Sequence, residues 1–231
     1  MQKMNTYTPA PGSRLARALL RPIFRGLFHL LADVRLEGLE NIPTGAPYLA
    51  AFNHVSVFDP PFVLTSWPGN IEVLGASDIW NRAGFGQNLL VRLYGAIPVH
   101  RGAYDREALE RVGAVLRAGY PLLMSPEGGR THAAAMRRAR PGVAFILEAA
   151  AVPILPVGVI GTSDDFFNRA LRWQRPQLIL RVGQPFCVPA VTGRGEERRI
   201  SRQRNADLVM RHIAALLPPE YRGEYQNFLV P

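Results

Sequence analysis

Short apolar segments that alternate with helical patterns constrain the fold of this chain more than any other feature. Helical periodicity is seen in residues 106–119, 142–150 and 198–217. Segments typical of strands and their turns lie within residues 34–43, 46–54, 95–102, 120–129, 152–161 and 177–186. This alternation predicts an α/β fold with a central sheet, mostly parallel or mixed, flanked by helices. Residues 192–199 are the one segment that we expect to be a flexible loop.

The N-terminal segment is predicted to be an amphipathic helix over residues 13–34. Its apolar face carries Leu15, Leu19, Ile23, Leu27 and Leu30 or Leu31, and its second stripe carries Arg14, Arg17, Arg21 and Arg25. Pro22 is expected to interrupt or kink this helix. Such a helix either packs on the core with solvated arginines or lies in a membrane interface. We assign residues 1–35 to an N-terminal amphipathic membrane-interface helix and residues 36–231 to one further domain, because 231 residues can bury a single core.

The charge of the chain favours anionic partners. Lys and Arg number 27 against 18 acidic residues, which gives a net charge of +9, and Lys3 is the only lysine. Such a surface attracts nucleic acid, anionic lipid headgroups or phosphorylated small molecules. Zinc-ligand spacing, a recognition-helix pattern and a basic patch interleaved with aromatic residues are absent from the sequence, so we do not expect nucleic acid as a partner.

The sequence also limits membrane and metal chemistry. No segment reaches the roughly 18 uncharged apolar residues that a spanning helix needs, and the N-terminus lacks a signal-peptide pattern. We therefore expect the protein to stay on the cytoplasmic side. A single cysteine, Cys187, excludes an internal disulfide and offers no metal framework.

The stretch AAFNHVSVFDPPF, residues 50–62, ends an apolar run in Asn53 and His54 and places Asp59 just before two prolines. Five residues on a regular helix turn through about 500°, so His54 and Asp59 would not share a helical face. We expect a loop that starts at the end of a strand, with Asp59 as the N-cap of the next helix. The imidazole and the carboxylate can then face each other, which is the arrangement of a general base. An N-cap aspartate beside an ordinary loop histidine has the same spacing.

Three further blocks accompany this pair. Residues 95–102, GAIPVHRG, end in Arg101 and Gly102; residues 125–132, SPEGGRTH, combine an acid, two glycines and an arginine; residues 152–161 are VPILPVGVIG. In this order the four blocks resemble the glycerophospholipid acyltransferase superfamily, and the lysophosphatidic acid (1-acyl-sn-glycerol-3-phosphate) acyltransferase family above all. The resemblance spans roughly residues 36–190 and makes residues 36–231 the expected acyltransferase domain. Ser125 and Gly129 depart from the family pattern, which usually has Phe and Thr there.

The resemblance implies a role for each matching residue. His54 would be the general base, oriented by Asp59, and the substrate-binding set would be Asn53, Arg101, Gly102, Glu127, Gly128 and Arg130. A glutamate repels phosphate, so Glu127 could instead anchor Arg130 or a backbone turn. The thioester of acyl-CoA or acyl carrier protein would be the co-substrate, with no cofactor and no metal.

The implied reaction is acyl transfer to the free hydroxyl of 1-acyl-glycerol 3-phosphate, forming phosphatidic acid. Alternatives are an acyltransferase acting on another lysophospholipid or on glycerol 3-phosphate, and a catalytically silent membrane-surface protein. The expected partners are a membrane lysophospholipid, acyl-CoA or acyl carrier protein, and an anionic membrane surface. The expected location is the cytoplasmic face of the cell membrane, as a peripheral, monotopic protein.

Overall fold

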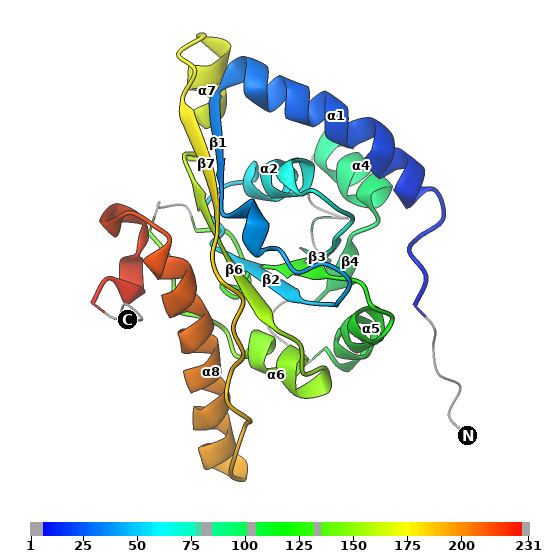
Figure 1. The fold of residues 1–231 in the computed structure, drawn as a ribbon, viewed down its shortest axis with the longest axis vertical. Helices are drawn as coiled ribbons and strands as arrows, with labels where there is room; N and C mark the ends of the chain where they lie inside the picture. Colours follow the sequence, from blue (N-terminus) through cyan, green and yellow to red (C-terminus); the bar gives the residue numbers. More distant parts are fainter. Residues whose placement is uncertain (1–6, 78, 80–84, 101–104, 132–134, 228–231) are drawn as a thin grey trace.

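The protein is a three-layer α/β structure, seen in a computed structural model that describes residues 7–77, 79, 85–100, 105–131 and 135–227 (Figure 1). Its central sheet consists of β1 (Asp33–Glu37), β2 (Leu49–Phe52), β3 (Glu72–Ala76), β4 (Ile97–Val99), β5 (Leu122–Met124), β6 (Ile154–Ile160) and β7 (Gln177–Val182). The strand order is β1-β7-β6-β2-β5-β3-β4. All neighbours are parallel except β6 and β7, which are antiparallel. The expected fold class, a mostly parallel sheet flanked by helices, is confirmed.

Helices cover both faces of the sheet. They are α1 (Ser13–Leu31), α2 (Asp59–Ser66), α4 (Phe85–Tyr94), α5 (Arg106–Arg117), α6 (Gly142–Ala149), α7 (Phe166–Leu171) and α8 (Gly195–Ala215), with short 3₁₀ turns at Leu39–Asn41, Pro219–Tyr221 and Gly223–Tyr225. One core layer packs α1, α2 and α7 against the sheet, and the other packs α5, α6 and α8. Strand β2 serves both layers, because Leu49 and Ala51 belong to one and Ala50 and Phe52 to the other.

Some elements differ from the expectations. Strand β3 and helices α4 and α7 were not predicted; β3 contains Glu72 and Gly75, which weaken an apolar strand pattern. Helix α8 begins at Gly195, so the expectation of a flexible loop over residues 192–199 is wrong from residue 195 onward. Helix α1 continues through Pro22 without interruption. No helix in the described part of the chain is long and apolar enough to cross a membrane.

Helix α1 exposes its leucine stripe, while two of its four stripe arginines, Arg17 and Arg21, turn toward the domain. Arg17 is buried and pairs with Glu72, and Arg21 donates to the backbone carbonyl of Trp67. Arg14 reaches the hydroxyl of Tyr120 at 3.0 Å. The idea of a fully solvated arginine stripe is therefore wrong for Arg17 and Arg21, because these guanidinium groups bind the domain. The apolar stripe is exposed instead, with Leu15, Leu19, Ile23, Leu27 and Leu30 each 45–66% exposed.

Candidate active site

The site forms where three neighbouring strands end at one edge of the sheet. Strand β2 lies between β5 and β6, and all three run in the same direction. Their carboxyl ends lead into His54, Ser125 and Gly161 respectively. In open α/β sheets this edge is where ligands bind. The topology therefore brings together residues that are more than 100 positions apart in the sequence.

His54 and Asp59 face each other across the loop between β2 and α2. The Nδ1 atom of His54 lies 2.8 Å from Oδ2 of Asp59. The carboxylate is fully buried, whereas the imidazole is 16% exposed and borders a cavity. Because Nδ1 binds Asp59, Nε2 is the ring nitrogen left for a substrate proton. Helix α2 begins at Asp59 with prolines next in the sequence, as expected, but the Asp59 side chain does not cap the helix.

The carboxylate of Asp59 instead binds back onto its own loop and across to β6. Its Oδ2 atom accepts hydrogen bonds from the backbone N–H groups of Val55 and Ser56, each at 2.7 Å. Its Oδ1 atom accepts the hydroxyl of Thr162, which is fully buried just after β6. The residue before Thr162 has to be glycine: Gly161 has φ +92°, and a Cβ there would lie 1.9 Å from the carbonyl oxygen of Gln177. Four donors therefore hold the carboxylate in one position.

Glu127 fixes the backbone beneath the histidine. Its Oε1 atom accepts the N–H of His54 at 2.8 Å, and its Oε2 atom accepts the N–H of Arg137 at 3.0 Å. The N–H of Thr131 returns to the carbonyl of His54 at 2.9 Å. Burial raises the pKa of Glu127, while these two N–H groups act against the rise. The side chain is 3% exposed and turned toward backbone, which places it beneath the site as an anchor of two segments.

The loop after β5 is shaped by Gly128. Its φ is +68°, and a Cβ there would lie 2.6 Å from Cδ of Arg140. Arg137 closes the loop from behind, because its guanidinium donates to the carbonyls of Gly129 and Arg130 at 2.9 Å each. Gly128, Gly129, Arg130 and Arg140 all border the cavity as a result.

A cavity of about 810 Å³ opens beside His54. Its walls are mostly apolar and come from α1, α2, α4, α5 and α6 as well as the strand ends, with Phe24, Phe52, Leu64, Leu90, Val112 and Ile146 among them. Two arginines of the described chain, Arg130 and Arg140, border it near the glycine loop. An apolar space with a few polar groups at one end suits a ligand with a long apolar part and an anionic head.

The other residues expected at the site have different positions. Asn53 is fully buried, and its amide exchanges two hydrogen bonds with the backbone of Val159, at 2.9 and 2.8 Å. This contact joins the ends of β2 and β6. Arg101 and Gly102 lie outside the described residues. Within the described part of the chain, no three His, Cys, Asp or Glu side chains gather as a metal site would require.

The same five-residue spacing occurs a second time, in His100 and Asp105. The two side chains lie 2.9 Å apart and border the cavity. Here, however, Asp105 caps α5 through the N–H of Ala108, and His100 is 72% exposed. The backbone N–H groups of His100 and Ala108 lower the pKa of Asp105 to about 2. The five-residue spacing alone therefore does not distinguish a buried His–Asp pair from an aspartate that caps a helix. The two cases differ in the neighbouring strands, since Asp59 is bonded to Thr162 after β6.

Sequence reasoning missed Thr162 and Arg140. Thr162 follows directly after the VPILPVGVIG block, and a hydroxyl at the end of a predicted strand is the signal that could have identified it. Arg140 lies in the basic run RRAR that precedes Pro141. Its place beside the cavity depends on the loop around Gly128, which the sequence pattern does not describe.

Comparison with known proteins assigns the region that contains this site to a family. The profile of the family described as Acyltransferase matches residues 33–160, more than half of the chain. The chain belongs to the Acyltransferase family. The matched region of this acyltransferase includes His54, Asp59 and the loop after β5, and the expected family is confirmed.

The fold is shared with a solved acyltransferase structure. The crystal structure of the 1-acyl-sn-glycerophosphate (LPA) acyltransferase PlsC from Thermotoga maritima superposes with a TM-score of 0.59. The two chains are 22% identical, and the match covers 85% of this acyltransferase and 79% of the Thermotoga chain. At this identity the likeness shows the fold. None of the curated proteins matches the chain.

Proposed function

We propose that this acyltransferase moves a fatty acyl group from acyl-CoA or acyl carrier protein to the free hydroxyl of 1-acyl-glycerol 3-phosphate. The product would be phosphatidic acid, a phospholipid precursor. One observation carries the proposal: the His54–Asp59 pair faces an apolar cavity whose described lining includes Arg130 and Arg140. An acyl chain and a phosphate are the two chemical parts that such a space would accommodate.

In the proposed reaction His54 is the general base. Its Nε2 atom takes the proton of the acceptor hydroxyl while that oxygen attacks the thioester carbonyl. Collapse of the tetrahedral intermediate breaks the carbon–sulfur bond, and the proton passes from His54 to the leaving thiolate. Asp59 holds the imidazole through Nδ1 and stabilises its charged form. The acceptor oxygen is itself the nucleophile, so no serine or cysteine acyl-enzyme is required.

The acceptor phosphate is assigned to the arginine end of the cavity. Guanidinium groups bind phosphate oxygens with paired hydrogen bonds, and Arg130 and Arg140 both border the space near Gly128. Arg101 and Gly102 stay in the proposed substrate-binding set from sequence alone. Asn53 and Glu127 are assigned to positioning and do not border the cavity. The side chain of Asn53 binds the backbone of Val159, and that of Glu127 accepts the N–H of His54.

The lipid would reach the cavity from a membrane surface. The exposed leucine stripe of α1 has the composition of an interfacial helix, and Leu20 and Phe24 of the same helix border the cavity. We therefore propose that α1 rests on the cytoplasmic face of the membrane as a peripheral attachment. Residues 1–35 would be the membrane-contacting segment and residues 36–231 the catalytic domain.

A panel of acceptors tests the proposal. The full chain is incubated with acyl-CoA or acyl carrier protein thioester and with lysophosphatidate, other lysophospholipids, glycerol 3-phosphate or monoacylglycerol, and the products are identified by mass spectrometry. Phosphatidic acid as the main product, absent with the His54→Ala variant, is the expected result. Preferred acylation of another acceptor would replace the proposed substrate. No transfer to any acceptor would favour a catalytically silent membrane-surface protein.

A further inference from the structure

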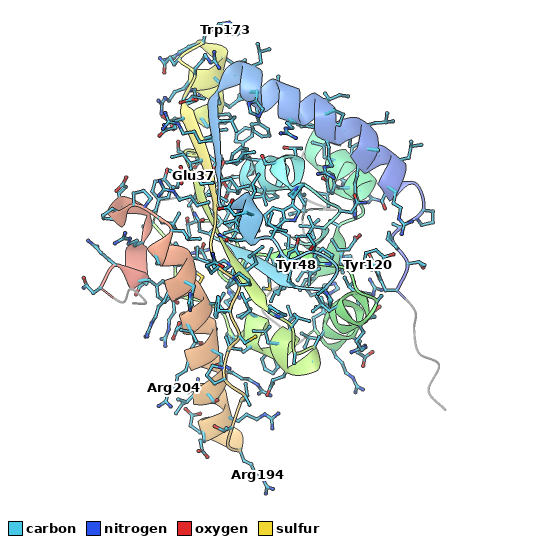
Figure 2. The ribbon with its side chains drawn as sticks, viewed as in Figure 1. Glu37, Tyr48, Tyr120, Trp173, Arg194 and Arg204 are labelled. Atoms are coloured by element: carbon cyan, nitrogen blue, oxygen red, sulfur yellow. The ribbon has the colours of Figure 1, made fainter. Side chains whose placement is uncertain are left out.

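A second exposed apolar surface lies beyond α1, around α7 and the turn that follows it. Phe167 is 47% exposed, Leu171 is 58% exposed and Trp173 is 65% exposed. Phe167 and Leu171 are four residues apart and share one face of α7. Figure 2 shows Trp173 at the outermost point of this end of the molecule. We call these three side chains the α7 tip.

The α7 tip presents its tryptophan in an unfavourable backbone conformation. Trp173 has φ +55° and follows the end of α7, a position that glycine usually occupies. Its N–H binds the carbonyl of Ala170 at 2.9 Å, which closes the helix end. A bulky residue is strained in this region, so the local backbone does not explain why tryptophan stands here. The exposed indole requires another reason.

The α7 tip lies beside the C-terminal end of α1. Arg175 donates to the carbonyls of His29 and Ala32 at the C-terminal end of α1, at 3.3 and 3.4 Å. Beneath them the rings of Phe28 and Phe166 lie 6.2 Å apart. Figure 1 shows α7 beside this end of α1. Leu27 and Leu30, in the last turns of α1, are also exposed.

The chemistry of the α7 tip matches a lipid interface. Tryptophan and arginine are residues that collect at the boundary between headgroups and acyl chains. Residues 164–175 carry three arginines, Arg169, Arg172 and Arg175, against two aspartates, one of which lies 3.9 Å from Arg169. The excess is positive and suits anionic headgroups.

The α7 tip also contacts the catalytic loop. The ring of Phe167 stacks on Phe58 at 5.9 Å, and Phe58 is the residue before Asp59. A bilayer that contacts the tip would therefore lie close to the loop that carries His54.

We propose that the α7 tip is a second membrane-contacting surface, which inserts Trp173 into an anionic bilayer alongside α1. The choice of a lipid partner rests on the proposed function. Two contacts at different places prevent the protein from pivoting about α1, so the pair sets the orientation of the cavity on the membrane.

Binding of the full chain to vesicles of equal parts phosphatidylcholine and phosphatidylglycerol tests this proposal without any turnover. Trp173→Gly should keep or raise thermal stability, because glycine suits the left-handed backbone, yet lower vesicle affinity about tenfold. Leu171→Ala should lower it in the same direction. Ile200→Ala, which removes an exposed apolar side chain on α8, is the matched control and should bind as the wild type does.

Tryptophan fluorescence locates the contact directly. Trp67 and Trp80 are present in both the wild type and Trp173→Phe, so the difference between their spectra is the emission of Trp173. This emission should shift to the blue with vesicles and be quenched by brominated phosphatidylcholine. Unchanged Trp173 emission while the protein sediments with vesicles would overturn the proposal. Vesicle binding by Trp173→Gly equal to that of the wild type would also overturn it. If ultracentrifugation then showed that this variant had lost only self-association, the tip would be a contact between copies of the chain. Vesicle insertion without acyl transfer would instead contradict the proposed function alone.

Discussion

Arg17 and Glu72 form a buried ion pair that joins α1 to the sheet. Both guanidinium–carboxylate contacts are 2.7 Å long, and the side chains are 2% and 1% exposed. Arg17 also donates to the carbonyl of Tyr94 at 2.9 Å. Burial acts to lower the pKa of Arg17, but the hydrogen bond and the charge of Glu72 outweigh it and raise this pKa. The Arg17–Glu72 pair thus attaches α1 to the domain, and removing one of the two charges would leave the other buried without its counter-charge.

The first prediction concerns this pair. Arg17→Met should lower the free energy of unfolding by about 3–5 kcal/mol, because Glu72 would remain buried without its partner. The double variant Arg17→Met, Glu72→Met should recover most of the loss, since two apolar side chains replace the two charges. Urea unfolding measures both, with Arg25→Ala on the exposed side of α1 as the neutral control. Equal stability of Arg17→Met and wild type would contradict the assigned role.

The second prediction concerns the exposed stripe of α1. Replacing Leu19 and Ile23 by serine should reduce binding to anionic vesicles at least about tenfold, because each side chain contributes roughly 1.5–3 kcal/mol when buried in lipid. Stability and transfer to a soluble short-chain acceptor should be unchanged. Salt should remove only part of the binding, because Arg17 and Arg21 bind the domain and leave Arg14 and Arg25 as the exposed arginines of the stripe. Undiminished sedimentation with vesicles would place the membrane contact elsewhere. Deleting residues 1–33 is the poorer test, since it also leaves Glu72 unpaired.

The third prediction concerns the base. His54→Ala should lower kcat by about 10²-fold or more, and Asp59→Asn should impair it severely, because general base catalysis typically contributes about 10²–10⁴-fold. Circular dichroism should show both variants folded. Near-normal turnover by folded His54→Ala would remove the proposed mechanism.

The fourth prediction concerns Thr162. Thr162→Val keeps the side-chain shape but removes the hydroxyl that donates to Asp59, and about 1–1.5 kcal/mol for one hydrogen bond corresponds to roughly a tenfold lower kcat. Thr162→Ser should restore the rate, while KM for the thioester should stay unchanged in both. A rate that follows side-chain volume, with serine as poor as valine, would indicate a packing role instead.

The fifth prediction concerns acceptor binding. Arg130→Ala and Arg140→Ala should raise KM for lysophosphatidate and leave acylation of monoacylglycerol, which has no phosphate, nearly unchanged. Arg138→Ala is the matched control, because Arg138 belongs to the same basic run but is 70% exposed near Asp207 and does not border the cavity. Equal losses with both acceptors would assign these arginines to structure.

The positions of His54 and Asp59 could be predicted from the sequence because both lie in one short loop. A strand pattern that ends in His54 and a helix start marked by Pro60 leave a short loop, and short loops restrict where two side chains can point. Asp59 nevertheless does not cap helix α2 as expected, because its carboxylate binds the N–H groups of Val55 and Ser56 in the preceding loop.

The direction in which α1 faces could not be predicted in the same way. Its periodicity separates a leucine stripe from an arginine stripe, and burial of the leucines would be the usual outcome. In the structure the leucine stripe is exposed and Arg17 and Arg21 turn toward the domain, because Glu72 on β3 and the carbonyl of Trp67 supply partners for their guanidinium groups. These partners are 46–55 residues away, so the periodicity of α1 carries no information about them.

By itself the sequence determined the α/β class, the strand-to-helix position of the His–Asp pair and the family, because these depend on local periodicity and on motifs read in order. The tertiary structure alone decided which strands are neighbours. The placement of β2 between β5 and β6 brings Thr162 to Asp59 and Glu127 to the backbone of His54 across separations of 103 and 73 residues. Such contacts arise from strand pairing and the burial of both sheet faces, which are properties of the whole chain rather than of any one segment.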